Sequence, residues 1–301
     1  MALNVNESYW RREFLRLEGA YSPATMRSYY SDVEAFEVWC AARDIVPFPA
    51  SVPTVCEFLE DQGKTKAPST VRRRLYAIRK VHRLLRLPDP TYDEDINLAF
   101  RRVRRRRAVR PQQAKGLNAP HLKRFLAVQP DSLLGLRNRA MLSLGYELLT
   151  RRSELVALKD NDLVLREDGT LRVLIRRSKA DQAGAGRIAF TSNRTAQLVL
   201  AWQDARGGQT NWLFCPVYQG KAIDRSLESN SVKRVIKETA EKAGFDREDI
   251  DRFSGHSMRV GAAQDLLVRG VDAVGIMRAG GWKSLSVLSR YLELAEHNVW
   301  Q

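Results

Sequence analysis

Cysteine and histidine, the residues typical of disulfide-linked and metal-binding proteins, are scarce in this chain of 301 residues, and it has no long apolar run. Its three cysteines are scattered and odd in number, so we expect no disulfide framework and a reducing, cytoplasmic setting. Only four histidines are present and no CxxC or HExxH pairing occurs, which argues against a metal site. Residues 1–10 lack the pattern of a signal peptide, and no apolar run approaches the roughly 18 residues of a membrane span. We therefore expect that the protein is not of the secreted, zinc-finger or integral-membrane class.

Positive charge is what the chain has in excess. Lys and Arg number 50 against 35 Asp and Glu, a formal net charge of +15. Residues 1–117 hold 22 basic and 14 acidic residues, and the remainder holds 28 and 21, so the excess is shared almost evenly. A hydrophobic fraction of 44% is that of a globular protein rather than a disordered polycation. These values predict a polyanionic partner, with nucleic acid favoured over an acidic membrane surface.

The length and the spacing of apolar residues predict two domains. Ser22-Pro23 has the N-cap residue and first-turn proline of a helix that continues to about residue 43. Further helices are expected to end near Gly63, to start near Ser69, and to span about 93–107. We therefore expect residues 1–108 to form a compact domain of four or five helices.

A basic linker is expected to follow, over residues 109–117. Seven of residues 101–110 are arginine, which predicts a strap against phosphates between the two domains. A solvated basic face is the alternative.

Residues 118–301 are expected to form a second domain, mostly helical with one small antiparallel sheet. Short runs at 163–165, 171–175 and 188–190, separated by turn residues, predict three strands. Helices are expected over about 119–128, 135–149, 193–206, 229–243, 256–269, 272–279 and 284–294, with a short one after Arg151.

The densest chemical signal is SGHSMRVG at residues 254–261. His256 and Arg259 share one face at the start of a helix, where free amides attract an anion. A guanidinium can clamp a phosphate there, and an imidazole can donate or accept a proton. A histidine at a helix start is, on its own, more often a capping or core residue.

Three other segments carry candidate residues. TRRSEL covers residues 150–155, RRSKAD covers 176–181, and AGGW covers 279–282, with Tyr291 nine residues after Trp282. Taken singly, each fits an ordinary ion pair, a basic hairpin or a core tyrosine.

Together the four segments resemble, in order and spacing, the tyrosine site-specific recombinase (integrase) family. The family pattern is an arginine in R-x-S-E-L, a lysine on the hairpin between the second and third strands, H-x-x-R, a His or Trp, and a tyrosine nine residues later. SGHS-x-RVGAA-x-DL and GGW are similar to the Cre-like members, and the resemblance covers roughly residues 20–295. It implies a mainly α fold, with a helical core DNA-binding domain and a mixed α/β catalytic domain.

The resemblance also implies a reaction and its residues. DNA is cleaved and rejoined through a covalent 3′-phosphotyrosyl link and a Holliday junction, without metal, cofactor or ATP. The implied partners are double-stranded DNA with inverted-repeat half-sites and three further copies in a homo-tetramer. The implied catalytic residues are Arg151, Glu154, Lys179, His256, Arg259, Trp282 and Tyr291.

Two departures leave alternatives open. The run before Arg151 lacks the T-G of the family's T-G-x-R, and Arg152 fills a usually apolar position, so Arg152 is an alternative to Arg151. The hairpin also holds Arg176, Arg177 and Arg187 beside Lys179.

The candidate DNA contacts lie on the helix from Ser69, at the end of the helix over 93–107, and on the helix over 229–243. Most are expected to touch phosphates rather than bases. They are Arg72, Arg73, Arg74, Arg79, Lys80, Arg83, Arg101, Arg102, Arg104, Arg105, Asn230, Lys233, Arg234 and Lys237.

Two other functions fit the same fold: a type IB-like topoisomerase and a catalytically idle DNA-binding regulator. The complete catalytic set argues against the idle regulator. The Cre-like N-terminal domain and Trp282 favour recombination over the topoisomerase. The apolar residues Leu294, Val299 and Trp300 predict that the C-terminal tail packs onto a neighbouring subunit or onto its own.

Overall fold

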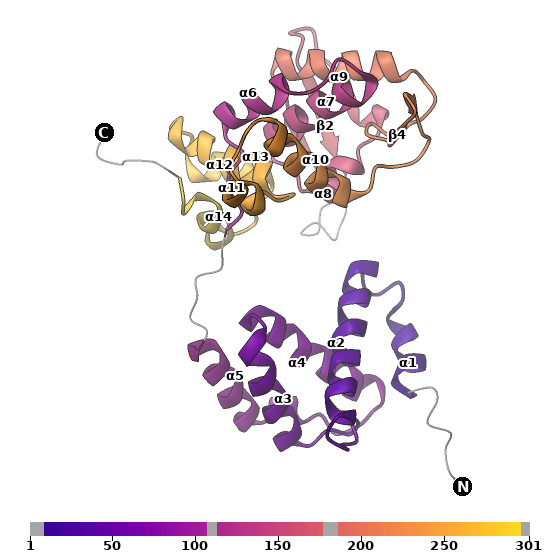
Figure 1. The fold of residues 1–301 in the computed structure, drawn as a ribbon, viewed down its shortest axis with the longest axis vertical. Helices are drawn as coiled ribbons and strands as arrows, with labels where there is room; N and C mark the ends of the chain where they lie inside the picture. The colour runs from indigo at the N-terminus through magenta and orange to yellow at the C-terminus, as the bar shows by residue number, and fades with distance from the viewer. Residues whose placement is uncertain (1–8, 107–112, 177–185, 296–301) are drawn as a thin grey trace. The chain divides into compact units, whose positions relative to one another are not determined.

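The computed structural model describes residues 9–106, 113–176 and 186–295, and the chain splits into two compact units, Met1–Pro111 and Gln112–Gln301 (Figure 1). Both units are mainly helical, and the second contains a three-stranded antiparallel sheet. The predicted fold class is confirmed. No helix of the described ranges is long and apolar enough to cross a membrane.

The first unit is built from helices, some of which begin at capping residues that the sequence shows. Its elements are α1 (Tyr9–Phe14), η1 (Leu15–Leu17), α2 (Pro23–Ala41), α3 (Val52–Thr65), α4 (Pro68–Leu84), η2 (Pro90–Tyr92) and α5 (Glu94–Arg106). The hydroxyl of Ser22 accepts a hydrogen bond from the Thr25 amide at 3.2 Å, and Pro23 follows it at the first helical position, as predicted. Helix α1 was not predicted, because six residues are too few to show a helical period.

The core of the first unit lies between α2, α3, α4 and α5. Phe36, Phe58, Ile78 and Ile96 are fully buried in it. The apolar stripe of α4 faces inward, so its basic residues lie on the remaining faces of the helix.

In the second unit, the other helices pack around α7, which is mostly buried. Its elements are α6 (Ala119–Ala127), α7 (Leu133–Glu147), α8 (Arg152–Val156), η3 (Asp160–Asp162), β1 (Leu163–Leu165), β2 (Leu171–Ile175), β3 (Arg187–Phe190), α9 (Asn193–Arg206), β4 (Val217–Tyr218), β5 (Lys221–Ala222), α10 (Ser229–Lys242), α11 (Arg247–Arg252), α12 (Ser257–Val268), α13 (Ala273–Gly280) and α14 (Leu285–Leu292).

The sheet has the order β1-β2-β3, with Val173 paired to Leu163 on one side and to Ala189 on the other. The hairpin β4–β5 and helix α11 were not predicted, because two-residue strands and a six-residue helix leave no periodic signal.

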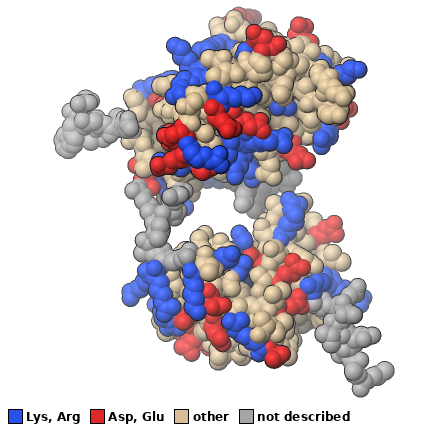
Figure 2. All heavy atoms as spheres, in the orientation of Figure 1, with Lys and Arg blue, Asp and Glu red and all other residues tan. Residues whose placement is uncertain are grey.

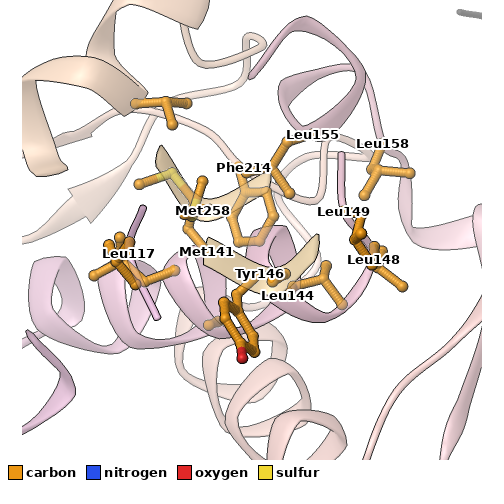
Figure 3. Close-up of a cluster of buried hydrophobic side chains, with 14 of the residues drawn as sticks. Leu117, Met141, Leu144, Tyr146, Leu148, Leu149, Leu155, Leu158, Phe214 and Met258 are labelled. Atoms are coloured by element: carbon orange, nitrogen blue, oxygen red, sulfur yellow. The ribbon is translucent and has the colours of Figure 1, made fainter. Parts of the chain in front are cut away.

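The core of the second unit continues beyond the end of α7. Met141, Leu144, Leu148 and Leu149 are buried in one cluster with Leu155 (Figure 3). Leu149 has a left-handed φ of 49°, a conformation that a branched side chain rarely adopts. The chain therefore turns sharply inside the core, two residues before Arg151.

Candidate active site

The structure brings together residues from three of the four motif segments, at positions 151, 259, 282 and 291. Arg259, in the first turn of α12, has its guanidinium carbon 3.8 Å from the ring centroid of Trp282, which follows α13. The same carbon is 5.7 Å from the ring centroid of Tyr291 on α14, and the Trp282 and Tyr291 rings are 5.0 Å apart at 70°. The positive charge of Arg151 is close enough to lower the pKa of Arg259.

Arg259 is held in place through only part of its guanidinium. Its residue is fully buried, and Nη1 donates to the carbonyl oxygens of Leu149 and, at 2.8 Å, Gly280. Desolvation, followed by the charge of Arg151, lowers the pKa of Arg259 to about 10, so it stays protonated at neutral pH.

The other donors of Arg259 and the indole N–H of Trp282 have no hydrogen-bond partner in the described part of the chain. Within the described ranges, Nε and Nη2 of Arg259 and Nε1 of Trp282 are buried without a hydrogen-bond partner. A buried donor without a partner is costly, by about 1–3 kcal/mol and more for a charged group. The arrangement fits a site that receives the oxygens of an anion.

The AGGW segment shapes the Trp282 side of this site. A Cβ built on Gly280 would lie 1.8 Å from the Trp282 ring, so only glycine admits the indole there. Gly281 has a left-handed φ of 69° and ends α13. The two glycines therefore turn the chain and place the indole against Arg259.

Arg151 is positioned by a buried carboxylate. Glu154, 4% exposed, accepts from the Arg151 amide at 3.0 Å and from Arg151 Nη1 at 2.5 Å. The side chain of Arg151 itself remains 21% exposed. Arg152 instead donates to Asn230 Oδ1 on α10 at 2.9 Å. The structure thus places Arg151 in the pair with Glu154, and Arg152 beside α10.

His256 precedes the first residue of α12 and its side chain is exposed. Its pKa is nevertheless lowered, first by desolvation from the surrounding protein and then by the charges of Arg152, Arg259 and Arg151. An imidazole in this environment is neutral at pH 7 and can accept a proton.

Tyr291 is half-buried, and its backbone carbonyl accepts from Gln264 Nε2 on α12 at 3.2 Å. Lys179 and Arg177 lie outside the described residues. No group of three or more His, Cys, Asp or Glu side chains able to hold a metal ion occurs in the part of the chain that the structure describes.

Many of the basic residues expected to contact DNA have partners within the protein. On α4, Arg73 pairs with the buried Asp32 at 2.6 Å, Arg79 donates to Thr91 Oγ1 at 2.8 Å, and Lys80 donates to Tyr21 Oη at 2.7 Å. Arg72 donates to Tyr76, Arg83 stacks near Tyr92, and Arg74 lies against Gln62 and Asp32 with only 14% of its side chain exposed.

Other candidates are more open. On α5, Arg101, Arg104 and Arg105 are exposed, and Arg102 pairs with Glu60 at 2.7 Å. Figure 2 shows Lys and Arg side chains gathered over α5 on the drawn face. On α10, a cavity of about 370 Å³ is lined by polar and charged side chains that include Asn230, Lys233, Arg234 and Lys237.

The sequence did not predict the structural role of Arg187, which was named only as an alternative to Lys179. Its Nη1 donates to the Ala279 carbonyl and its Nη2 to the Leu148 carbonyl, both at 2.6 Å. No sequence signal marks this role, because its acceptors are backbone oxygens from distant segments.

Comparison with known proteins identifies two matching family models. The phage integrase family matches residues 115–298, and the N-terminal SAM-like domain of phage integrases matches residues 8–87. The chain is 29% identical over 293 residues to an integrase/recombinase XerD homolog of Selenomonas ruminantium, covering 92% of this chain and 84% of that one. It is 27% identical over 297 residues to the recombinase Cre of Escherichia phage P1, covering 93% and 87%.

Solved structures show the same fold. The XerH site-specific recombinase bound to palindromic difH substrate aligns with a TM-score of 0.65 at 16% identity, over 90% of this chain and 76% of that one. A lambda integrase dimer bound to a COC′ core site aligns with a TM-score of 0.62 at 15% identity, over 96% and 78%.

Proposed function

Because this chain belongs to the phage integrase family and is a tyrosine recombinase, we propose that it recombines DNA by a 3′-phosphotyrosyl intermediate formed on Tyr291. The observation that carries the proposal is the set of unpartnered buried donors on Arg259 and Trp282, beside the Tyr291 ring. An anionic phosphodiester supplies the acceptors that these donors lack.

The first step exchanges one phosphate ester for another. The Tyr291 hydroxyl oxygen bonds to phosphorus, and the bond from phosphorus to the 5′ oxygen breaks. The phenol has an ordinary pKa of about 10, so its proton needs an acceptor, for which neutral His256 is suited. Lys179 gives a proton to the departing 5′ oxygen. The ester energy is retained in the phosphotyrosyl link, so rejoining needs no ATP.

The transition state gathers negative charge on the non-bridging oxygens. Arg259 and Arg151 stabilise that charge with fixed guanidinium forks, and Trp282 Nε1 adds a neutral donor. Glu154 positions Arg151, because both of its carboxylate oxygens accept hydrogen bonds from that residue.

The DNA partner is a duplex with inverted-repeat half-sites, recombined by a homo-tetramer through a Holliday junction. Support comes from the net charge of +15 and from the exposed arginines of α5. We place a helical DNA-binding domain at 1–108, the linker at 109–117 and the catalytic domain at 118–301. Affinity should fall steeply with salt, since each neutralised phosphate releases counterions.

A plasmid assay tests this function against a topoisomerase. Footprinting on the DNA that neighbours the gene locates the half-sites, and two copies are placed in direct repeat on one supercoiled plasmid. Recombination predicts excision of the intervening segment and no relaxation of a plasmid without the site. Relaxation of the site-free plasmid without excision would contradict the proposal.

A further inference from the structure

Arg187 connects two backbone segments of the candidate active site. It opens β3, and its two terminal nitrogens donate separately to the carbonyl oxygens of Leu148 and Ala279, each at 2.6 Å. Leu148 lies three residues before Arg151, and Ala279 lies three residues before Trp282. One side chain therefore joins the segments that lead into two proposed phosphate ligands.

Arg259 joins the same two segments one residue further along. Its Nη1 donates to the carbonyl oxygens of Leu149 and Gly280. Two adjacent carbonyls on each segment, 148–149 and 279–280, are thus held by two guanidinium groups. Arg259 also has free donors that can bind the phosphate. Of the two arginines, Arg187 is therefore the one whose hydrogen bonds, within the described ranges, go to backbone carbonyls and to nothing else.

The acceptors explain why an arginine is suited to this position. Leu148 follows the last residue of α7, and Ala279 is in the last turn of α13. The final carbonyls of a helix have no intrahelical donor and form the negative end of its dipole. A planar guanidinium with two forward N–H groups satisfies one carbonyl from each helix, which a lysine ammonium does with poorer geometry.

The surroundings of Arg187 set it apart from a surface DNA contact. It is half-buried, and within the described ranges it forms no ion pair with a carboxylate. A Cβ on Gly281 would lie 2.9 Å from Arg187 Cδ, so the stem of Arg187 packs against the AGGW turn. Desolvation lowers the pKa of Arg187 to about 10, partly offset by the charge of Glu154.

We propose that Arg187 is a positioning residue for strand cleavage, which holds the ends of α7 and α13 together so that Arg151, Arg259 and Trp282 converge on one phosphate. This inference rests on the function proposed above. It assigns Arg187 neither to DNA binding nor to proton transfer.

The test compares Arg187→Lys and Arg187→Gln with the wild type. DNA affinity and single-turnover cleavage at saturating DNA are measured separately, well below the melting temperature of each variant. Because misplacing a catalytic group by about 1 Å can cost about a hundredfold, we expect cleavage to slow by about tenfold to a hundredfold in both variants. DNA affinity should stay within about twofold of the wild type.

Arg206→Lys is the matched control. Arg206 is buried and, like Arg187, donates to a backbone carbonyl, that of Trp212, but it pairs with Asp160 away from the site. Its replacement should lower the melting temperature without slowing cleavage. Circular dichroism establishes that each variant is folded. Arg187→Lys is the milder of the two Arg187 changes, because it keeps the charge and most of the aliphatic stem.

A substrate with a 5′-thio leaving group separates positioning from acid catalysis. Such a leaving group needs no proton, so it should rescue loss of an acid but not loss of the Arg187 bridge. The inference would be overturned by any of three results. These are a cleavage rate of folded Arg187→Gln equal to that of the wild type, a defect in DNA affinity alone, and rescue of cleavage by the thio substrate. Failure of the proposed function is recognised separately, by the absence of a covalent adduct with the wild-type protein.

Discussion

The guanidinium carbon of Arg259 lies 3.8 Å from the ring centroid of Trp282, and both residues have buried donors without a partner in the described ranges. The indole face stabilises the cation, while its Nε1 and the free guanidinium nitrogens stay available. The stacking therefore fixes the direction of Arg259 without consuming the groups that an anion would bind.

Replacing Arg259 by lysine should abolish most cleavage. An ammonium cannot hold the Leu149 and Gly280 carbonyls and also present a fork to the phosphate. By comparison with the loss of one oxyanion-hole donor, we expect single-turnover cleavage to fall by about 10²–10³-fold. Arg166→Lys, an exposed arginine paired with Asp168 on the β1–β2 turn, is the control and should cleave normally. Equal rates for the two variants would remove Arg259 from the reaction.

The pH dependence of cleavage should report His256. Its pKa is lowered by desolvation and by three arginines, so the neutral, proton-accepting form persists below the usual value near 6.5. At subsaturating DNA, where the pH dependence reports the free protein, the decline in cleavage between pH 8 and 5 should be centred below 6.5. His256→Gln should lose this decline, whereas His121→Asn, at another histidine of lowered pKa, should keep it. A decline centred above 6.5 would conflict with this assignment.

Gly280→Ala should damage the site through packing alone. The added Cβ would lie 1.8 Å from the Trp282 ring, so the indole must move away from Arg259. Overpacking of this kind costs about 1–3 kcal/mol, and we expect both a lower melting temperature and slower cleavage. Gly208→Ala adds the same methyl group where no atom lies within 4 Å, and should change neither. An unaltered cleavage rate in Gly280→Ala would show that the Trp282 position does not matter.

Elements with a long period, a clear cap or a marked apolar run were predictable, including the short β1 and α8, whereas other short elements were missed. Ser22-Pro23 marks the start of α2, whereas α1, α11 and the β4–β5 hairpin are too short to leave a pattern. The candidate catalytic residues are spread between positions 151 and 291, and only the motif order predicted that they would meet. The convergence of Arg151 and Tyr291 on one buried pair, Arg259 and Trp282, depends on packing that the sequence does not display.

Long-range partners also escaped prediction. The arginines on the helix from Ser69 were predicted to contact DNA, yet Arg73 pairs with Asp32, which lies 41 positions earlier on α2. Arg187 is similar, because its acceptors are the carbonyls of Leu148 and Ala279. Backbone acceptors have no residue signature, so only the folded chain reveals them.

The role of Tyr291 as the nucleophile is tested by a search for a covalent protein–DNA adduct on a nicked suicide substrate carrying the protein's own site. The wild-type chain should form an adduct, and peptide mapping should find the 3′ phosphate on the Tyr291 oxygen. Tyr291→Phe should bind the same DNA with equal affinity and form no adduct. An adduct formed by Tyr291→Phe, or one mapped to another residue of the wild type, would contradict the account.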